Sequence, residues 1–457
     1  MAKIDNSSKA NHLCVLVHGP CSSSLWGNPS HLDYMVVALK ERHGEDNIHI
    51  LCPEGNSGNF TYDGVEVGGE RVVHEVEETL QRLEKQGQKI TKLSIVGYSL
   101  GGLVARYAVG LLHANGLLDK VEPMNFTTFA SPHVGVRTPN KGVGGHIWNG
   151  LGPRLVSMSG QQLFMVDSFR DTGRPLLSLL ADPESIFIKG LKRFQNKSVY
   201  GNVVNDRTTA FYSTLFTKTD PFRNLDDINI NYVEGYDRVI VNPDQFLLPL
   251  DPKEPETCAS EKWRRFRLFA ENMPFYLLVM LLLPPAAAVF CINSGVQTLR
   301  SQKRIRLHLE GKGRALFGKY KVPLLVQDVQ HVMDEVVESA NSRQEPDYLS
   351  SSDPEASDSS ENVAKKSIKR NKAKTGLSAK LKRSDTEKST PEFSTLALTP
   401  DQFDIIDSLN DVGFRKYPVY IHNHRHSHAA IIVRIQKDAF DEGKTVMKHW
   451  LDNEFAI

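Results

Sequence analysis

Residues 93–112, LSIVGYSLGGLVARYAVGLL, decide the fold of this chain. The apolar run at 93–97 is typical of a buried parallel strand, and the pattern at 101–112 is typical of a helix. Between them, Gly97-Tyr98-Ser99-Leu100-Gly101 matches GxSxG. A strand that enters this motif and a helix that leaves it predict a nucleophile elbow, a strained turn that exposes the Ser99 hydroxyl. The alternative is an ordinary strand–turn–helix unit with an incidental serine.

Further strands and helices flank this unit on both sides. We expect strands at 13–17, 48–52, 125–130 and 198–204, because each is a short run rich in apolar or β-branched residues. Residues 69–86 carry valines and leucines on one helical stripe and predict an amphipathic helix. Alternating strands and helices predict an α/β fold, with a mostly parallel sheet and helices on both faces.

The overall composition excludes several classes of protein. The chain has 457 residues and a net charge of +1, so it is no globally basic nucleic-acid binder. No apolar stretch of signal-peptide length precedes Leu13, which argues against a cleaved secretory signal. The five cysteines are scattered and form no CxxC pair, which argues against a disulfide framework or a zinc site and favours a reducing compartment.

Residues 275–292, FYLLVMLLLPPAAAVFCI, contain no charged residue. A helix of this length reaches about 27 Å, barely the thickness of a bilayer core. Pro284 and Pro285 interrupt it near the middle, and basic clusters flank both ends. This pattern predicts a hairpin that enters one leaflet of a membrane, or the monolayer of a lipid droplet, and returns. A buried pair of core helices and a straight transmembrane span are the alternatives.

The remaining segments complete the predicted domain organisation. We expect a hydrolase core at 10–250 with a possible cap at 134–195, and an anchoring region at 251–340. Residues 341–397 are polar and charged, first acidic and then basic, and predict a disordered linker. We favour a solvated linker over one whose basic half contacts lipid head groups. Residues 398–457 would return the chain to the core.

That C-terminal part has its own expected strands. The runs YPVYI at 417–421 and AAIIVRI at 429–435 are the candidates, and order is expected to begin again at 400–411.

A serine hydroxyl is a weak nucleophile, so an acid and a base must accompany Ser99. In enzymes with this elbow they follow in the order Ser, Asp or Glu, His. Asp206 comes just after the expected strand at 198–204 and is the favoured acid, with Asp220 and Asp237 as competitors. The backbone N–H of Leu100, at the start of the helix, is placed to face a developing oxyanion.

The base is expected among the histidines near the C-terminus. His428 stands where a loop meets the expected strand at 429–435 and is the favoured base, with His426 as the second choice. The run HNHRHSH at 422–428 also resembles a metal-binding tract. No cysteine or carboxylate at suggestive spacing accompanies it, so metal binding is the weaker hypothesis.

The chain resembles the serine esterase family of α/β-hydrolases found in eukaryotes, which includes fungal lipases. The resemblance rests on VLVHG, LWGNPSHL, SIVGYSLGGLVARYA, NFTTFASPHVG, NVVNDRTTAFYS and HSHAAI, which occur in this order. It implies that Ser99, Asp206 and His428 form the triad. It also implies an acyl-lipid substrate, and the hydrophobic segment resembles that of lipid-droplet members. The implied location is the lipid droplet or endoplasmic reticulum, with the catalytic domain facing the cytosol.

The chain departs from the family pattern near the expected oxyanion hole. PCSSS at 20–24 separates Gly19 from Leu25-Trp26-Gly27-Asn28, which family members join directly to the His-Gly pair. Pro20 has no N–H to donate. Either Leu25 folds back to supply the second oxyanion N–H, another loop amide replaces it, or the site is impaired.

The sequence thus predicts a serine esterase or lipase that cleaves carboxylic esters of lipids, such as phospholipids or acylglycerols, through an acyl-enzyme. No metal or organic cofactor is expected. The expected partners are the lipid substrate and a membrane or droplet surface, contacted by 275–292 and its basic flanks. The alternatives are an esterase of soluble esters or acylated proteins, and a catalytically impaired scaffold at a lipid surface.

Overall fold

The structure is a computed structural model. It describes residues 10–19, 29–57, 60, 63–137, 158–206, 208–223, 225, 228–249, 299–307 and 393–457.

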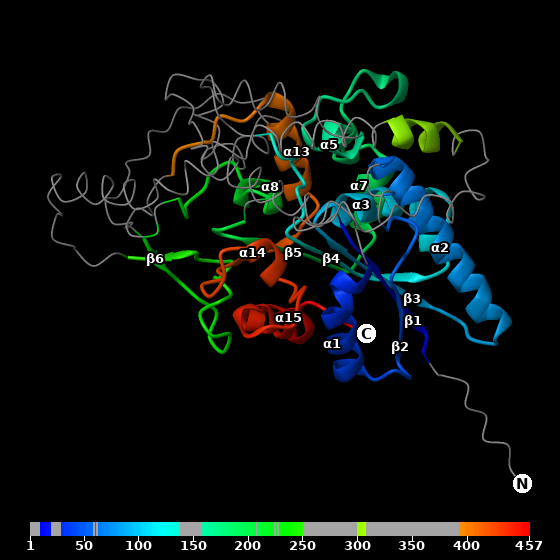
Figure 1. Cartoon of the computed structure of the whole chain (residues 1–457), viewed down its shortest axis with the longest axis horizontal. Helices are drawn as coiled ribbons and strands as arrows, with labels where there is room; N and C mark the ends of the chain where they lie inside the picture. Colours follow the sequence, from blue (N-terminus) through cyan, green and yellow to red (C-terminus); the bar gives the residue numbers. More distant parts are fainter. Residues whose placement is uncertain are drawn as a thin grey trace, which may run out of the picture.

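A six-stranded, all-parallel sheet forms the centre of the molecule (Figure 1). Its strands are β1 (His12–Val17), β2 (Ile48–Leu51), β3 (Lys92–Tyr98), β4 (Glu122–Phe129), β5 (Asn196–Asn202) and β8 (Arg415–Val419). They lie in the order β2-β1-β3-β4-β5-β8. The central pair is therefore β3 and β4, and β3 is the strand that ends just before Ser99. The short antiparallel pair β6 (Asn229–Ile230) and β7 (Leu247–Leu248) lies apart from this sheet.

The helices connect and cover the strands. They are α1 (Asp33–His43), α2 (Val65–Lys85), α3 (Leu100–Ala114), α5 (Met158–Leu163), α6 (Leu176–Leu180), α7 (Ile186–Lys192), α8 (Phe211–Thr214), α13 (Pro400–Asn410), α14 (Ser427–Ala430) and α15 (Asp441–Asn453). Short 3-10 turns occupy Pro29–Leu32, Leu117–Asp119, Arg170–Thr172 and Asp438–Phe440.

The sheet separates two hydrophobic cores, as the alternation along β1 shows. Leu13 and Val15 belong to one buried cluster, whereas Cys14 and Leu16 belong to the other. Successive side chains of a strand point to opposite faces, so a strand buried on both sides reads as one apolar run. The predicted α/β fold with helices on both faces is confirmed.

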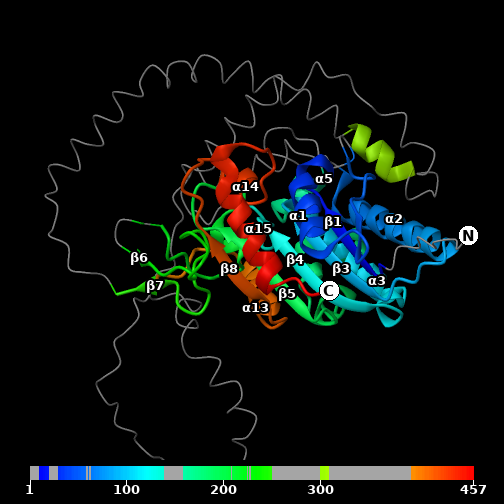
Figure 2. The same cartoon turned by 90° about the horizontal axis from the view of Figure 1, so that it is seen from below.

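Each core is closed by its own set of helices (Figure 2). The valines of α2 pack with α3 and α7 on one face, where Tyr107 and Phe187 have ring centroids 5.0 Å apart. On the other face, α1 lies beside α15, and Trp450 of α15 is fully buried against Phe129. The helix predicted at 69–86 is α2, and it begins four residues earlier than expected.

The C-terminal segment completes the sheet. A capping box fixes the start of α13, in which Thr399 accepts from the N–H of Gln402 and Gln402 accepts from the N–H of Thr399. The chain then enters β8, which pairs in parallel with β5 from Ser198↔Arg415 to Asn202↔Val419. The strand expected near 417–421 is thus present, at Arg415–Val419.

The strand predicted at 429–435 is wrong. Its first residues lie in α14 and the following ones in turns, and Val433 has a positive φ of 54°. The whole run from Ala429 to Val433 is buried in the core that contains Trp450. Its apolar character therefore reflects burial rather than an extended backbone, two causes that periodicity alone does not separate.

Other predictions fall outside the described residues. The hydrophobic segment 275–292, the insertion 20–24, residues 138–157 of the possible cap and residues 341–392 of the expected linker are among them. Of the helices in the described ranges, none combines the length and the apolar character needed to cross a membrane.

Candidate active site

Ser99 occupies a strained turn between β3 and α3. Its backbone has φ 55° and ψ −131°, a combination that L-residues rarely adopt and that costs about 1–3 kcal/mol. The turn is held because the N–H of Ser99 donates to the carbonyl of Phe129, at 2.9 Å. The geometry matches the nucleophile elbow expected from the sequence.

Two glycines of the motif allow this turn to form. A Cβ added to Gly97 would lie 2.4 Å from the Cα of Gly102, and one added to Gly101 would lie 2.2 Å from the carbonyl oxygen of Val17. No side chain fits at either distance. The glycines are therefore needed for close backbone contact between β3, the start of α3 and the end of β1.

His428 lies on the short helix α14, just beyond β8. The hydroxyl of Ser427 donates to the carbonyl of Val204, at 2.9 Å, which ties α14 to the segment after β5. The hydroxyl of Tyr98 donates to the carbonyl of His428 at 3.0 Å, and the two rings are 5.2 Å apart. The two hydrogen bonds fix the backbone of α14, and the imidazole lies beside the ring of Tyr98, the residue that precedes Ser99.

Asp206 lies in the loop after β5 and has a fixed orientation. Its Oδ1 accepts hydrogen bonds from the backbone N–H groups of Thr208 and Thr209, at 3.0 and 2.8 Å. Its Oδ2 accepts from the side-chain amide of Asn202, at 2.9 Å. These three donors therefore fix the carboxylate and hold one of its oxygens toward His428.

The three predicted residues lie in one hydrogen-bonded row. The Nε2 of His428 is 3.0 Å from the hydroxyl of Ser99, and its Nδ1 is 2.9 Å from Oδ2 of Asp206. The side chains of His428 and Asp206 are each only 3% exposed, and Ser99 is equally buried. This arrangement can pass the hydroxyl proton to a histidine that an acid orients.

The competing residues lie elsewhere. Asp220 accepts from the N–H of Phe222 at 3.0 Å, and burial raises its pKa to about 6. Asp237 is exposed, in a turn with a positive φ of 45°. His426 precedes α14, and its ring contacts that of His424 rather than the hydroxyl of Ser99.

The backbone N–H of Leu100 is the predicted first oxyanion donor. Leu100 opens α3, and the first N–H groups of a helix have no partner within the helix. The backbone at Gly19 lies against this group, because a Cβ added there would be 2.7 Å from the nitrogen of Leu100. Leu25, the predicted second donor, lies outside the described residues.

The sequence did not reveal a buried cation behind the elbow. Arg106 of α3 is fully buried, with Nη1 at 3.5 Å from both Nδ1 and the carbonyl of His133. Burial lowers the pKa of Arg106 to about 9 and the pKa of His133 well below its ordinary value. In the sequence Arg106 appears as one more residue of a helix, and no spacing rule marks it as buried.

Within the described ranges, no group of three His, Cys, Asp or Glu side chains is arranged to hold a metal ion. The histidines of 422–428 point to different partners. His422 stacks on Tyr420 with ring centroids 3.7 Å apart, whereas His428 faces Asp206 and Ser99.

A cavity of about 560 Å³ lies beyond β8, lined by Leu225, Ile228, Asn229, Ile230, Tyr232, Asp237, Arg238, Tyr420 and His422. None of the three residues of the hydrogen-bonded row lines it. The cavity therefore does not identify where an acyl chain would bind.

The parallel sheet, the strained serine elbow and the histidine and aspartate delivered after later strands define an α/β-hydrolase-like protein. Comparison with known families agrees. Residues 7–220 match the family described as "Putative serine esterase (DUF676)", which confirms the family resemblance over this region. The match includes Ser99 and Asp206, whereas His428 lies beyond it.

Curated fungal proteins are similar over the same part of the chain. One is the putative lipase ROG1 of Saccharomyces cerevisiae, 30% identical over 213 residues, which are 46% of this chain and 29% of that protein. Another is the putative lipase C4A8.10 of Schizosaccharomyces pombe, 27% identical over 210 residues, 45% of this chain and 26% of that protein. The similarity thus spans less than a third of each relative.

Proposed function

We propose that this protein is a serine hydrolase that cleaves carboxylic esters of lipids through an acyl-enzyme intermediate. The observation that carries the proposal is the row Ser99–His428–Asp206, with contacts of 3.0 and 2.9 Å. The matched family and the names of the fungal relatives support ester hydrolysis. The lipid nature of the substrate is our own extension, supported by the word lipase in those names.

In the acylation step, the hydroxyl oxygen of Ser99 attacks the acyl carbonyl carbon while Nε2 of His428 takes the hydroxyl proton. Asp206 accepts the hydrogen bond from Nδ1–H and stabilises the imidazolium that forms. The N–H of Leu100 donates to the oxyanion. The intermediate then collapses, the ester C–O bond breaks, and His428 returns the proton to the leaving alcohol.

In the deacylation step, water attacks the acyl-serine with His428 as the base. The carboxylic acid leaves, and the proton returns to the hydroxyl of Ser99. Because Asp206 is held by the N–H groups of Thr208 and Thr209 and by Asn202, the carboxylate need not move during either step.

We also propose that the protein works at a membrane or lipid-droplet surface, with its catalytic domain in the cytosol. The support is the uncharged segment 275–292 with its basic flanks. Deletion of 275–292 should release the protein from membranes and leave hydrolysis of a short soluble ester unchanged. Recovery of the wild type in the soluble fraction would argue against a surface location.

A fluorophosphonate probe tests the nucleophile directly. The purified wild type should be labelled at Ser99, and Ser99→Ala should lose the label. Ser178→Ala, a buried serine of α6 outside the row, is the matched control and should retain it. Equal labelling of wild type and Ser99→Ala would refute the assignment.

A panel of substrates separates the lipid proposal from its alternatives. Phospholipid vesicles, acylglycerol emulsions, short soluble esters and an acylated peptide should be compared for the wild type and Ser99→Ala. Turnover of short esters alone favours an esterase of soluble substrates. An unlabelled and inactive wild type favours an impaired scaffold, the outcome that Pro20 suggests because it lacks an N–H next to Gly19.

A further inference from the structure

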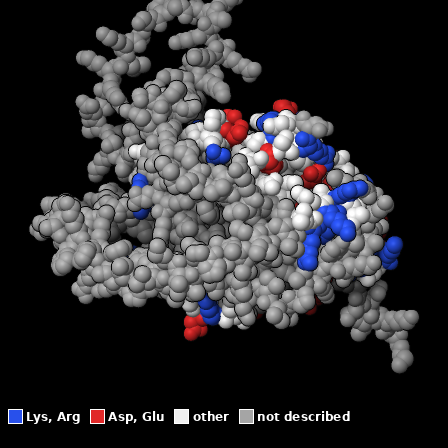
Figure 3. All heavy atoms as spheres, turned by 45° about the horizontal axis from the view of Figure 1, so that its top comes forward, with Lys and Arg blue, Asp and Glu red and all other residues white. Residues whose placement is uncertain are grey.

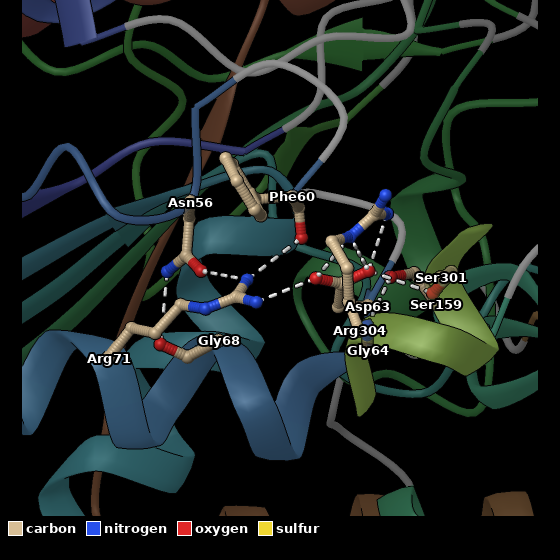
Figure 4. Close-up of polar contacts among 9 residues, drawn as sticks. All are labelled: Asn56, Phe60, Asp63, Gly64, Gly68, Arg71, Ser159, Ser301 and Arg304. Atoms are coloured by element: carbon tan, nitrogen blue, oxygen red, sulfur yellow. Dashed lines mark hydrogen bonds and ion pairs between the residues drawn. The ribbon is translucent and has the colours of Figure 1, made fainter. Parts of the chain in front are cut away.

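Asp63 is a buried carboxylate between two arginines that are far apart in the sequence (Figure 4). Its Oδ2 is 2.6 Å from Nη2 of Arg71, and its Oδ1 is 2.7 Å from Nη2 of Arg304. The hydroxyl of Ser301 donates to Oδ1 at 2.8 Å. The exposed fractions of the Asp63, Arg71 and Arg304 side chains are 0%, 7% and 3%.

The ring of Phe60 packs against both guanidinium groups. Their Cζ atoms are 5.0 Å from the ring centroid for Arg71 and 5.4 Å for Arg304. The carbonyl of Phe60 also accepts from Arg71, at 3.2 Å. These contacts exclude water from the ion pair and fix the helix at 299–307, which carries Ser301 and Arg304, to the main domain.

This contact lies at the catalytic edge of the sheet. Asp63 comes between the end of β2 and the start of α2, so it lies at the carboxyl ends of the parallel strands, as does Ser99 after β3. The next residues bind α5, because the N–H of Gly64 donates to the hydroxyl of Ser159 and the N–H of Val65 donates to Gln162. The helix at 299–307 accordingly lies near the top of Figure 1, as does α5.

The helix at 299–307 buries two polar side chains and exposes an apolar one. A helix that packs on a domain in water normally turns its apolar side inward. Here the fully buried residues are Ser301 and Arg304, and the apolar Ile305 and Leu307 are half-buried. Leu299, in contrast, is 69% exposed, and Arg300 and Lys303 are exposed beside it. In Figure 3, basic side chains gather toward the right-hand side of the face that includes the top of Figure 1. An apolar side chain next to exposed cations suits an interface with anionic head groups.

We propose that the helix at 299–307 contacts an anionic lipid surface and that the Asp63–Arg304 pair fixes this contact at the catalytic edge, so that the site of Ser99 faces the lipid. This inference rests on the proposed function. Arg304 is then a positioning residue: it does not touch substrate but sets the orientation in which bound enzyme meets it. We name a lipid surface as the partner of this helix because the uncharged run 275–292 precedes the helix in the sequence.

The test compares two arginines of the same helix in the full-length protein. Arg304→Met breaks the buried contact and leaves the Asp63–Arg71 pair, whereas Arg300→Met removes one exposed positive charge and serves as the matched control. Three quantities are measured: hydrolysis of a short soluble ester, binding to vesicles of phosphatidylcholine and phosphatidylserine, and hydrolysis of long-chain ester lipids in those vesicles.

We expect Arg304→Met to hydrolyse the short soluble ester at the wild-type rate. Its rate on ester lipids in vesicles, compared at equal amounts of bound protein, should fall roughly tenfold because the orientation of the reacting groups is lost. Arg300→Met should keep that rate at equal bound protein. Equal vesicle rates for the two variants would overturn the proposal. If the wild type itself does not hydrolyse the short soluble ester, this result would instead overturn the proposed function.

A second measurement does not depend on how Arg304→Met folds. An environment-sensitive fluorescent amino acid is placed at Gln302, on the outer side of the helix, or at Glu84, near the end of α2 at the opposite edge of the sheet. Vesicles with phosphatidylserine should shift the emission at 302 to the blue and leave the emission at 84 unchanged. A shift at 84 without one at 302 would show that the other edge faces the lipid.

Discussion

Two buried aspartates, Asp206 and Asp63, have opposite kinds of partner. The Asp206 side chain is 3% exposed and faces the imidazole of His428, a type of side chain that transfers protons in general acid–base catalysis. The Asp63 side chain is 0% exposed and faces two guanidinium groups, which donate hydrogen bonds to its two oxygens. Burial alone therefore does not identify a reactive carboxylate. The protonation chemistry of its partner separates an acid suited to catalysis from one suited to fixing structure.

The largest expected effect is on turnover. Asp206→Asn keeps the size of the side chain and its acceptor for the N–H groups of Thr208 and Thr209, but it no longer selects the productive tautomer of His428. We expect kcat for a short ester to fall about 10⁴-fold, with little change in stability. Steady-state kinetics and urea unfolding measure the two quantities. A fall of less than tenfold would assign the orienting role to another acid.

Asp63→Asn should show the reverse pattern. It leaves two buried guanidinium groups without their carboxylate, so we expect the free energy of unfolding to fall by about 3–5 kcal/mol. Urea unfolding measures this loss. The short-ester rate for each active site, counted with a fluorophosphonate titration, should stay near that of the wild type. A large loss of that rate with full stability would place Asp63 in the chemistry.

A smaller effect concerns buried histidines and pH. Burial lowers the pKa values of His12, His18 and His449 from 6.5 to about 4. Below pH 6.5 the unfolded chain takes up protons that these residues cannot take up in the folded protein until about pH 4. The protein should therefore lose stability as the pH falls through this window.

His449→Gln tests this pH dependence at one residue. Glutamine keeps a possible acceptor near the Tyr200 hydroxyl, which lies 2.9 Å from Nδ1 of His449. The loss of unfolding free energy between pH 7 and pH 5 should shrink by about 1–2 kcal/mol. Urea unfolding at both values measures it. An unchanged loss would show that His449 does not contribute.

The smallest effect is expected for a surface ion pair whose N–O distance equals that of the buried Asp63–Arg304 pair. Arg193 and Asp119 are 2.7 Å apart, as are Arg304 and Asp63, but their side chains are 39% and 63% exposed. Water solvates the remaining charge after Asp119→Asn, so stability should change by less than about 1 kcal/mol. Urea unfolding of the Asp119 and Asp63 variants under the same conditions measures the two losses of unfolding free energy. Equal losses would contradict the role given to burial.

The sequence predicted most of the sheet and the three residues of the row, because these depend on local patterns. Apolar runs place β1 and β3, the glycines specify the turn at Ser99, and the chain order of acid and base limits the candidates. The catalytic roles themselves remain predictions. The failure at 429–435 has a physical cause: its first five residues, 429–433, are buried, and a buried run is apolar whether it is extended or folded into turns.

The cluster around Asp63 was not predictable in the same way. Arg304 is 241 residues away from Asp63 in the sequence, and no spacing rule connects two positions at that separation. In the sequence, Arg304 is one of several arginines and lysines after the hydrophobic segment, and only its burial distinguishes it from Arg300. The long-range contact is a property of the folded chain.

The position of β8 at the edge of the sheet sets the order of events during biosynthesis. The ribosome makes Ser99 and Asp206 long before residues 415–430, which form β8 and bring His428 to the row. A nascent chain therefore carries a serine without its base until residues 415–430 have emerged. On the proposed mechanism, ester hydrolysis begins only after His428 has been made, when the segment 275–292 has already had the opportunity to reach a lipid surface.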